Sequence, residues 1–459
     1  MLRSQPARCW RALQRGPLSI RCLHSEPISH NPPPWRPVSA LDEFVERQIR
    51  PISLRQLTFF GRTLTESRLI SSANYVRTEL PTRSVLPGKC RALLLLNVIP
   101  DRLAHRLRDI QKLPYVVVAN PHFSLVYELY YKAFERFRTV PEIRTLDDND
   151  SFCDILRKTL REHLVVIPRL AMGVLECRGL LPADAMDQFM NTLLRARISR
   201  RVIAEQHLAL TETFNSPWHY PGSQDRTDLN ADFVGEVFLK CNAKEVVERC
   251  GKLVQDMIRQ TSGSDKIPEI SVRGHLDATF PYMLSHLEYI IGELLRNSIQ
   301  AVSERYQTLQ LMPPPIEVLI CEAPQHVIMR VSDQGGGIPR ELLPYLWSFT
   351  KGPHSKVRLE NLGRVPAMAA TLQELSVSNE TKHADKETFR ESSLDTLTSR
   401  FPDRRLGIGL PMSRVYAEYW AGSLELHSLE GYGVDAFLQI SKLGNKNEQV
   451  TTRAAIDAV

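Results

Sequence analysis

The stretch RVSDQGGGIPREL (residues 330–342) ends a strand-like run with Asp333 and then places three glycines in a row. Adjacent glycines lose more backbone freedom on folding than other residues do, so the chain needs them for a positive φ or for a close approach to the main chain. A tight turn or a bound ligand would explain such a segment. The stretch therefore predicts a bend at the end of a β-strand, and with it a candidate binding loop.

The composition is that of an ordinary globular protein. The chain has 459 residues, of which 43% are hydrophobic and 24% are charged, and it is long enough for two or three domains. The net charge of +6 is modest and does not indicate nucleic-acid binding. The longest apolar run, ALLLLNVI (residues 92–99), is far shorter than the ~20 residues needed to span a bilayer, so we expect no membrane span.

The N-terminal segment, residues 1–25, has the features of a mitochondrial presequence. It contains five arginines, and no acidic residue occurs before Glu26. A disordered basic tail is the alternative interpretation. We expect the mature protein to begin in a Pro-rich linker, residues 26–40, and to reside in the mitochondrial matrix.

Residues 41–213 predict a helical bundle. Apolar residues recur there at spacings of three and four, which is the period of an amphipathic helix. The segments with this pattern are residues 41–49, 54–62, 102–113, 126–137 and 189–210. A cluster of Pro, Gly, Ser, Asn and Asp in residues 214–232 then predicts a linker between domains.

Residues 233–443 mix strands with helices, which favours an α/β sandwich. IEVLICE and HVIMRVS (residues 316–332) predict one hairpin, and SLELHSL and GVDAFLQI (residues 423–440) predict another. Helices are expected at about residues 283–306 and 412–420. The polar segment 352–404 is longer than an ordinary loop, so we expect it to close over a ligand, and residues 444–459 form a tail.

Four separated motifs carry the candidate chemistry. ELLRNSIQA places Glu293 and Asn297 one helical turn apart, on one face. The glycine stretch after Asp333 is the second motif, and FTKG (residues 349–352) is the third. The fourth, LGIGLPMSRVYAEY (residues 406–419), puts glycines before a helix whose free N-terminal amides can bind phosphate oxygens.

In this order and at these separations, the four motifs resemble those of the GHKL ATPases and kinases, the superfamily of DNA gyrase and the bacterial histidine kinases. The chain from about residue 51 to 440 is similar to the mitochondrial kinases of α-ketoacid dehydrogenases, also in PISLRQLTFFG, ELPTR, VVIPRLAMGVLE and RISRRVIAEQH. The resemblance implies an α+β fold, with an N-terminal all-α helical bundle followed by a GHKL-type α/β sandwich that binds ATP.

The resemblance also implies roles for individual residues. Glu293 would accept the proton of a substrate serine, and Asn297 would hold Mg²⁺ through its amide oxygen. Asp333 would accept a hydrogen bond from the adenine amino group. The remaining nucleotide contacts, to the base and ribose or to the phosphates, would come from Gly335, Gly337, Thr350, Gly407, Ile408, Gly409 and Leu410.

Arg296 and His286 lie on the same predicted helix as the base. Arg296 either adds charge near the phosphates or covers a solvated helix face. His286 lies on the same helix and is expected to be a core or surface histidine, not a phosphoacceptor.

By resemblance, the protein is a mitochondrial protein-serine kinase that uses ATP and Mg²⁺ to phosphorylate and inactivate the α subunit of the pyruvate dehydrogenase complex. Its helical domain would dock the lipoyl domain of the acyltransferase core, and the kinase would form a homo- or heterodimer. Tyr289, one turn before the base, favours the branched-chain dehydrogenase kinase as an alternative. Val434 and Arg405 depart from the family's pattern and motivate a non-catalytic, GHKL-like scaffold as a further alternative.

Overall fold

The computed structural model describes residues 39–46, 52–61, 63–77, 98–215, 233–262, 266–352, 355–365, 368 and 406–442. The predicted presequence and tail lie outside these ranges. So do Arg405, most of the two predicted linkers and most of the segment predicted to close over a ligand.

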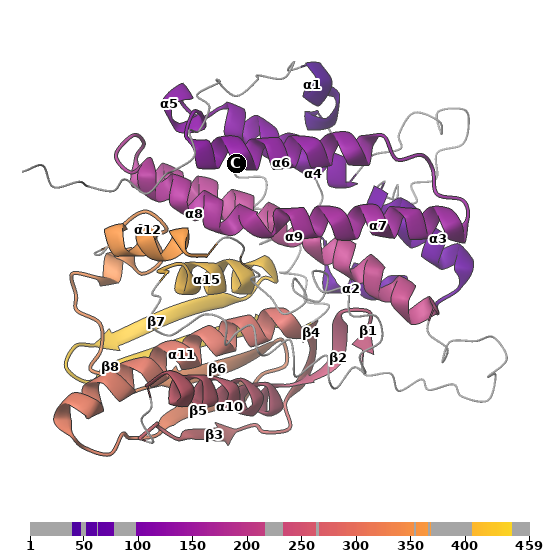
Figure 1. Cartoon of the computed structure of the whole chain (residues 1–459). Helices are drawn as coiled ribbons and strands as arrows, with labels where there is room; N and C mark the ends of the chain where they lie inside the picture. The colour runs from indigo at the N-terminus through magenta and orange to yellow at the C-terminus, as the bar shows by residue number, and fades with distance from the viewer. Residues whose placement is uncertain are drawn as a thin grey trace, which may run out of the picture. The chain divides into compact units, whose positions relative to one another are not determined.

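The first half of the chain is helical, as predicted, and Figure 1 shows its helices above the sheet. Capping residues mark the N-terminus of several of these helices. Thr145 and Asp148 form a capping box at the start of one helix, and Asn120 caps another by accepting a hydrogen bond from the His122 amide, 2.9 Å away. The helices are α1 (Ser39–Val45), α2 (Leu54–Phe59), α3 (Glu66–Arg77), α4 (Val98–Gln111), α5 (Tyr115–Val118), α6 (Pro121–Arg138), α7 (Leu146–Glu162), α8 (Val166–Glu176) and α9 (Ala183–Asn215).

The second half contains two sheets, and the predicted mixture of helices and strands is confirmed. A five-stranded sheet has the order β3-β5-β6-β8-β7, with β3 parallel to β5 and the other pairs antiparallel. A three-stranded sheet has the order β1-β2-β4. The strands are β1 (Phe233–Val234), β2 (Val237–Asn242), β3 (Ile270–Gly274), β4 (Thr279–Met283), β5 (Ile316–Glu322), β6 (His326–Ser332), β7 (Ser423–Leu429) and β8 (Gly433–Ser441).

Both predicted hairpins are present, β5 with β6 and β7 with β8. Helices α11 (Leu284–Leu309) and α15 (Gly409–Tyr419) lie where helices were expected, and α12 (Ser355–Gly363) lies in the polar segment. The sequence analysis did not identify β1 to β4 or the helix α10 (Ala243–Ser262).

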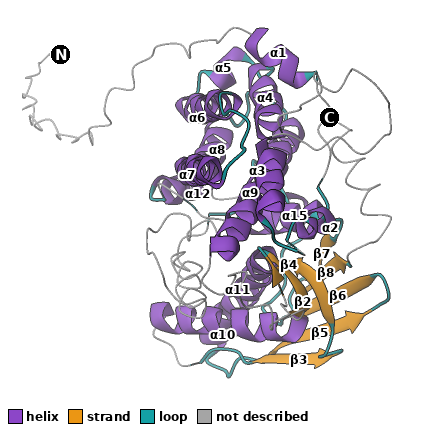
Figure 2. Ribbon diagram, turned by 90° about the vertical axis from the view of Figure 1, so that its right-hand side faces the viewer, coloured by secondary structure: helices purple, strands orange, loops and turns teal. Residues whose placement is uncertain are grey.

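Helices cover one face of the five-stranded sheet, and Figure 2 shows α10 and α11 on the same side of the strands. Alternate side chains of the central strands are buried beneath them, as expected for strands with one face in the core: Ile316, Val318, Ile320, Val327, Met329, Val331, Ala436, Leu438 and Ile440. The opposite side chains are half-buried or exposed along β5 and β6. This arrangement fixes α11 against the strands that end at the glycine stretch.

The helical half contacts the sandwich through α8 and α9. Arg195 of α9 pairs with Glu418 of α15, and the Arg178 guanidinium, just after α8, donates to the Ser355 hydroxyl of α12 at 2.7 Å. Between α7 and α8, the carbonyl of Leu164 accepts a hydrogen bond from the amide of Met368, 3.0 Å away. Helix α12, which follows the third motif, and helix α15, which belongs to the fourth, are therefore attached to the helical half.

The glycine stretch forms a tight loop against the turn between β7 and β8. Gly336 and Gly337 have φ values of +99° and +74°, which only glycine adopts at low cost. The Gly431 amide donates to the Gly336 carbonyl at 2.8 Å, and the Gly336 amide donates to the Tyr432 carbonyl at 3.0 Å. A Cβ on Gly337 would overlap the carbonyl oxygen of Leu429. Positive φ and main-chain packing thus explain these glycines before any ligand is considered.

Gly337→Ala is expected to destabilise the fold more than Gly431→Ala does. Both residues have positive φ, so each alanine costs about 1–2 kcal/mol of backbone strain. A Cβ at Gly431 would meet no atom within 4 Å, whereas the one at Gly337 would also displace the β7–β8 turn. Melting temperatures of the purified variants measure the difference. Equal melting temperatures for the two variants would contradict this packing argument.

Candidate active site

Helix α11 carries the predicted base on its buried side. Glu293 is 2% exposed, and one turn earlier Tyr289 packs against Tyr416 of α15 with ring centroids 5.1 Å apart. His286 is buried, and its Nδ1 lies 2.9 Å from the Nε1 of Trp420, which donates the hydrogen bond. This partner places His286 in the core between α11 and α15. The prediction of a core or surface histidine is therefore confirmed, and the core is its location.

The carboxylate of Glu293 lies between Arg296 and the start of α15. It forms an ion pair with the half-buried Arg296 guanidinium, and a Cβ on Gly409 would overlap its Oε2. The first and fourth motifs therefore meet at this carboxylate, and Gly409 leaves room for it. A negative charge is also favoured at the N-terminus of a helix. For Arg296 the sequence predicted either a phosphate contact or a solvated helix face, and the structure adds this pairing with Glu293.

Asn297 follows Glu293 by one turn and is exposed. Its amide makes no hydrogen bond with the part of the chain that the structure describes. A free amide oxygen is a hard ligand of the kind that Mg²⁺ binds, and Mg²⁺ in proteins usually keeps waters and substrate phosphates as its other ligands. The residue therefore fits the metal-binding role predicted for it.

Asp333 is held by hydrogen bonds from three directions. Its Oδ2 accepts from the Ser298 hydroxyl at 2.9 Å, and its Oδ1 accepts from the amides of Gly335 at 2.9 Å and Val434 at 3.4 Å. An ionised carboxylate has about four acceptor positions, so roughly one remains for an adenine amino group. Burial raises the pKa of Asp333 above its ordinary value, although the bonds from Gly335 and Ser298 act in the opposite direction. Ser298 was not identified from the sequence, where it reads as one more residue of a buried helix.

Val434 forms hydrogen bonds with Asp333 through its main chain. Its carbonyl accepts from the Asp333 amide at 2.9 Å, in addition to the longer bond that its own amide donates. A Cβ on the preceding Gly433 would overlap the Asp333 carbonyl. Val434 departs from the family's pattern in its side chain, whereas its hydrogen bonds to Asp333 come from its main chain.

Thr350, in the third motif, is 3% exposed and faces the helical half. Its amide and its hydroxyl each lie 3.2 Å from Oδ1 of Asp187, on α9, and its hydroxyl also lies 3.0 Å from that of Ser348. The structure thus gives Thr350 a protein partner that the sequence did not indicate. Its predicted contact with phosphate stays a prediction.

The first glycine of the fourth motif, Gly407, has no room for a side chain, because a Cβ would overlap the Arg358 guanidinium. Gly407 has a φ of +68°, and its carbonyl accepts from the Arg358 guanidinium of α12 at 3.1 Å. Ile408 occupies the N-cap position of α15, and Gly409 and Leu410 are the first two residues of this helix. Their amides have no partner within the helix, because the first N–H groups of any helix lack one. The main-chain amides that could bind phosphate therefore lie next to the Glu293 carboxylate.

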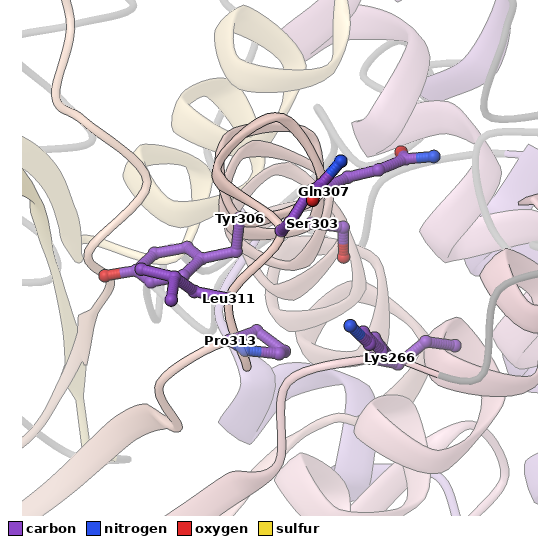
Figure 3. Close-up of a pocket in the computed structure, with 8 residues that line it drawn as sticks. Lys266, Ser303, Tyr306, Gln307, Leu311 and Pro313 are labelled. Carbon is purple, nitrogen blue, oxygen red and sulfur yellow. The ribbon is translucent and has the colours of Figure 1, made fainter.

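A pocket of about 300 Å³ lies at the other end of α11 and contains none of the predicted site residues. Ser303, Tyr306 and Gln307 line it from the helix, as Figure 3 shows. Ser303 follows Glu293 by ten residues, or about 15 Å along the helix axis. This pocket is distinct from the site around Glu293 and Asp333.

Comparison with known proteins identifies both halves of the chain. Residues 51–86 and 90–238 match the family described as mitochondrial branched-chain alpha-ketoacid dehydrogenase kinase. Residues 284–443 match the histidine kinase-, DNA gyrase B- and HSP90-like ATPase family. A Saccharomyces cerevisiae protein, pyruvate dehydrogenase (acetyl-transferring) kinase 2, mitochondrial, is 33% identical over 449 residues, covering 88% of this chain and 84% of that protein. The chain belongs to the family of mitochondrial α-ketoacid dehydrogenase kinases.

Other members of this kinase family are more distant in sequence. The mitochondrial pyruvate dehydrogenase (acetyl-transferring) kinase of Arabidopsis thaliana is 29% identical, over 86% of this chain and 92% of that protein. Isozyme 4 of the Homo sapiens kinase is 24% identical, over 89% of this chain and 85% of that protein. The resemblance inferred from the four motifs is thereby confirmed, and the ATPase match implies that this kinase family member uses ATP.

Within the described ranges, no helix combines the length and the apolar character that crossing a bilayer requires.

Ser298→Ala is expected to weaken ATP binding most at acidic pH. The lost bond is worth about 1 kcal/mol, or roughly fivefold in affinity. As the pH falls through the raised pKa of Asp333, the carboxylate is protonated and loses an acceptor, so affinity falls. Without the Ser298 hydroxyl this pKa rises further, and the fall begins at a higher pH. Titrations of ATP at several pH values measure the shift.

Ser303→Ala is the matched control, because Ser303 lies on the same helix and lines the distant pocket. Its pH profile should follow that of the wild type. If Ser298→Ala also follows the wild type, Ser298 does not support Asp333 in nucleotide binding.

Proposed function

We propose that this protein is a mitochondrial protein-serine kinase that phosphorylates, and so inactivates, the α subunit of the pyruvate dehydrogenase complex with MgATP. One observation carries the proposal. Helix α11 places the Glu293 carboxylate against Gly409, at the start of α15, and also holds Asp333 through Ser298. Three relatives across yeast, plant and human bear the name of pyruvate dehydrogenase kinases. They support this complex as the substrate.

The residues of the site divide the transfer reaction between them. Glu293 takes the proton of the serine hydroxyl while the serine oxygen bonds to the γ-phosphorus and the bond from that phosphorus to the bridging oxygen of ADP breaks. Asp333 orients the adenine, and the amides of residues 407–410 hold phosphate oxygens. Mg²⁺, held by Asn297, would supply charge neutralisation at the phosphates. Positioning and electrostatics then carry most of the rate enhancement.

The proposal extends to the rest of the chain. Residues 41–213 would form the helical domain that docks the lipoyl domain of the acyltransferase core, and residues 233–443 the ATP-binding domain, with 352–404 as its lid. Residues 1–25 would direct the protein to the mitochondrial matrix. There it would act as a homo- or heterodimer.

The branched-chain dehydrogenase is the second candidate substrate. The family matched by residues 51–86 and 90–238 is named for that kinase, and Tyr289 agrees with it. A scaffold without activity is the third candidate, because Val434 and Arg405 depart from the family's pattern. The presence of both Glu293 and Asn297 argues against it, since a scaffold has no chemical need for a base and a metal ligand together.

Incubation with γ-labelled ATP and both dehydrogenase complexes is expected to label the α subunit of pyruvate dehydrogenase. Glu293→Gln is the control: loss of the base should lower transfer by about 10²- to 10⁴-fold and leave ATP affinity nearly unchanged. Label on the branched-chain α subunit alone would select the second candidate. No transfer by a wild-type protein that binds ATP would select the scaffold.

Asn297→Ala is expected to abolish the part of ATP affinity that depends on Mg²⁺. Calorimetric titrations with and without Mg²⁺ should differ for the wild type and coincide for the variant, because the amide oxygen is the protein ligand removed. Gln307→Ala, an exposed amide on the same helix, is the matched control and should keep the difference. A variant that still responds to Mg²⁺ as the wild type does would show that Asn297 is not the ligand.

A further inference from the structure

One carboxylate of the helical half holds the loop that contains Thr350. Oδ1 of Asp187, in the first turns of α9, accepts hydrogen bonds from the Phe349 amide at 2.9 Å and from the Thr350 amide and hydroxyl at 3.2 Å each. Its Oδ2 accepts from the Ser348 hydroxyl at 2.6 Å. Four donors of three consecutive residues thus converge on a single side chain.

The shape of this loop depends on an acceptor from outside it. Consecutive amides that point to one place form an anion-binding concavity, and they repel each other unless an anion or a carboxylate fills it. Thr350 is almost fully buried, so water cannot replace the partner that it would lose. Asp187 therefore determines where the Thr350 hydroxyl points.

A second side chain connects the same loop to the start of α15. The guanidinium of Arg358, on α12, donates to the carbonyls of Phe349 at 3.1 Å and Lys351 at 3.4 Å. It also donates to the carbonyls of Leu406 at 3.2 Å and Gly407 at 3.1 Å. Arg358 is buried, and its charge is attracted by that of Asp187. A shift of the Thr350 loop would thus reach the amides at the N-terminus of α15.

We propose that Asp187 is a positioning residue of the nucleotide site, through which the helical half sets the phosphate-binding geometry of the ATP-binding half. The inference rests on the proposed function, because it concerns the affinity of that same site. It adds a residue from outside the ATPase fold, 163 positions before Thr350 in the chain. The part of the site proposed to bind adenine, which Asp333 and Ser298 form, does not depend on Asp187.

The experiment compares ATP with adenosine, which lacks the phosphates. Asp187→Ala should weaken ATP binding about tenfold or more, as expected for loss of several bonds to a charged group, and leave the adenosine affinity unchanged. Asp187→Asn keeps an acceptor oxygen for the two amides and should retain ATP affinity to within about threefold. Both ligands are titrated calorimetrically on folded, monodisperse protein.

Asp184→Ala is the matched control. Asp184 lies on the same turn of α9, its side chain is 90% exposed, and it pairs with the Lys351 ammonium at 2.8 Å. Its removal should leave both affinities unchanged. If Asp187→Ala does not fold, Ser348→Ala leaves Asp187 in place and removes the hydroxyl that donates to its Oδ2 and also accepts from the Lys351 amide at 2.8 Å. It should loosen the same loop and weaken ATP about threefold without affecting adenosine.

The outcomes separate this inference from the proposed function. A wild-type protein that binds neither ligand would refute the proposed function itself. A wild type that binds ATP, together with Asp187→Ala or Ser348→Ala variants that bind it equally well, would overturn the positioning role alone. Equal losses for ATP and adenosine would also overturn it, because they indicate general damage to the fold.

Discussion

The site depends on how closely the glycine loop approaches helix α11 and the turn between β7 and β8. Gly335 lies so near α11 that its Cβ would come within 2.6 Å of that of Ala301, and Gly337 lies against the Leu429 carbonyl. Arg305, near the end of α11, donates to the carbonyls of Gln334 and Tyr432 and so fastens loop and turn to the helix. Bare main chain at this point brings Asp333 within reach of Ser298, a residue of the same helix that carries Glu293.

The same closeness explains why departures from the family's pattern need not abolish the site. Asp333 is supported by amides and by a serine of α11, and the residue at position 434 contributes only its main chain to that support. Tyr289 is a core residue that packs on Tyr416, so its identity affects the contact between α11 and α15. In the proposed mechanism the chemistry rests on Glu293 and Asn297, and neither of these departures replaces either residue.

The sequence predicted those features that depend on residues close together in the chain. Strand-like runs on either side of a short turn revealed the hairpins β5–β6 and β7–β8, and glycines beside polar residues revealed the motifs. Strands β1 to β4 were not predicted because they are short or do not alternate apolar and polar residues. Helix α10 was not predicted because it contains none of the four motifs. Asp187 and Arg358 could not be found, since each lies in an unremarkable helix and acts on carbonyls or amides of a distant segment. The partner of a polar side chain is a tertiary property, which periodicity does not encode.

Arg358 has one more consequence, for the length of the chain between it and Leu406. Its guanidinium holds the segments on both sides, residues 349–351 and residues 406–407, so the two ends of this connection are fixed in space whatever lies between them. The separation in space between the third motif and the start of α15 is therefore set by this one side chain and by the pairing of β6 with β8, which flank the whole region in sequence, and not by the number of residues between the two segments.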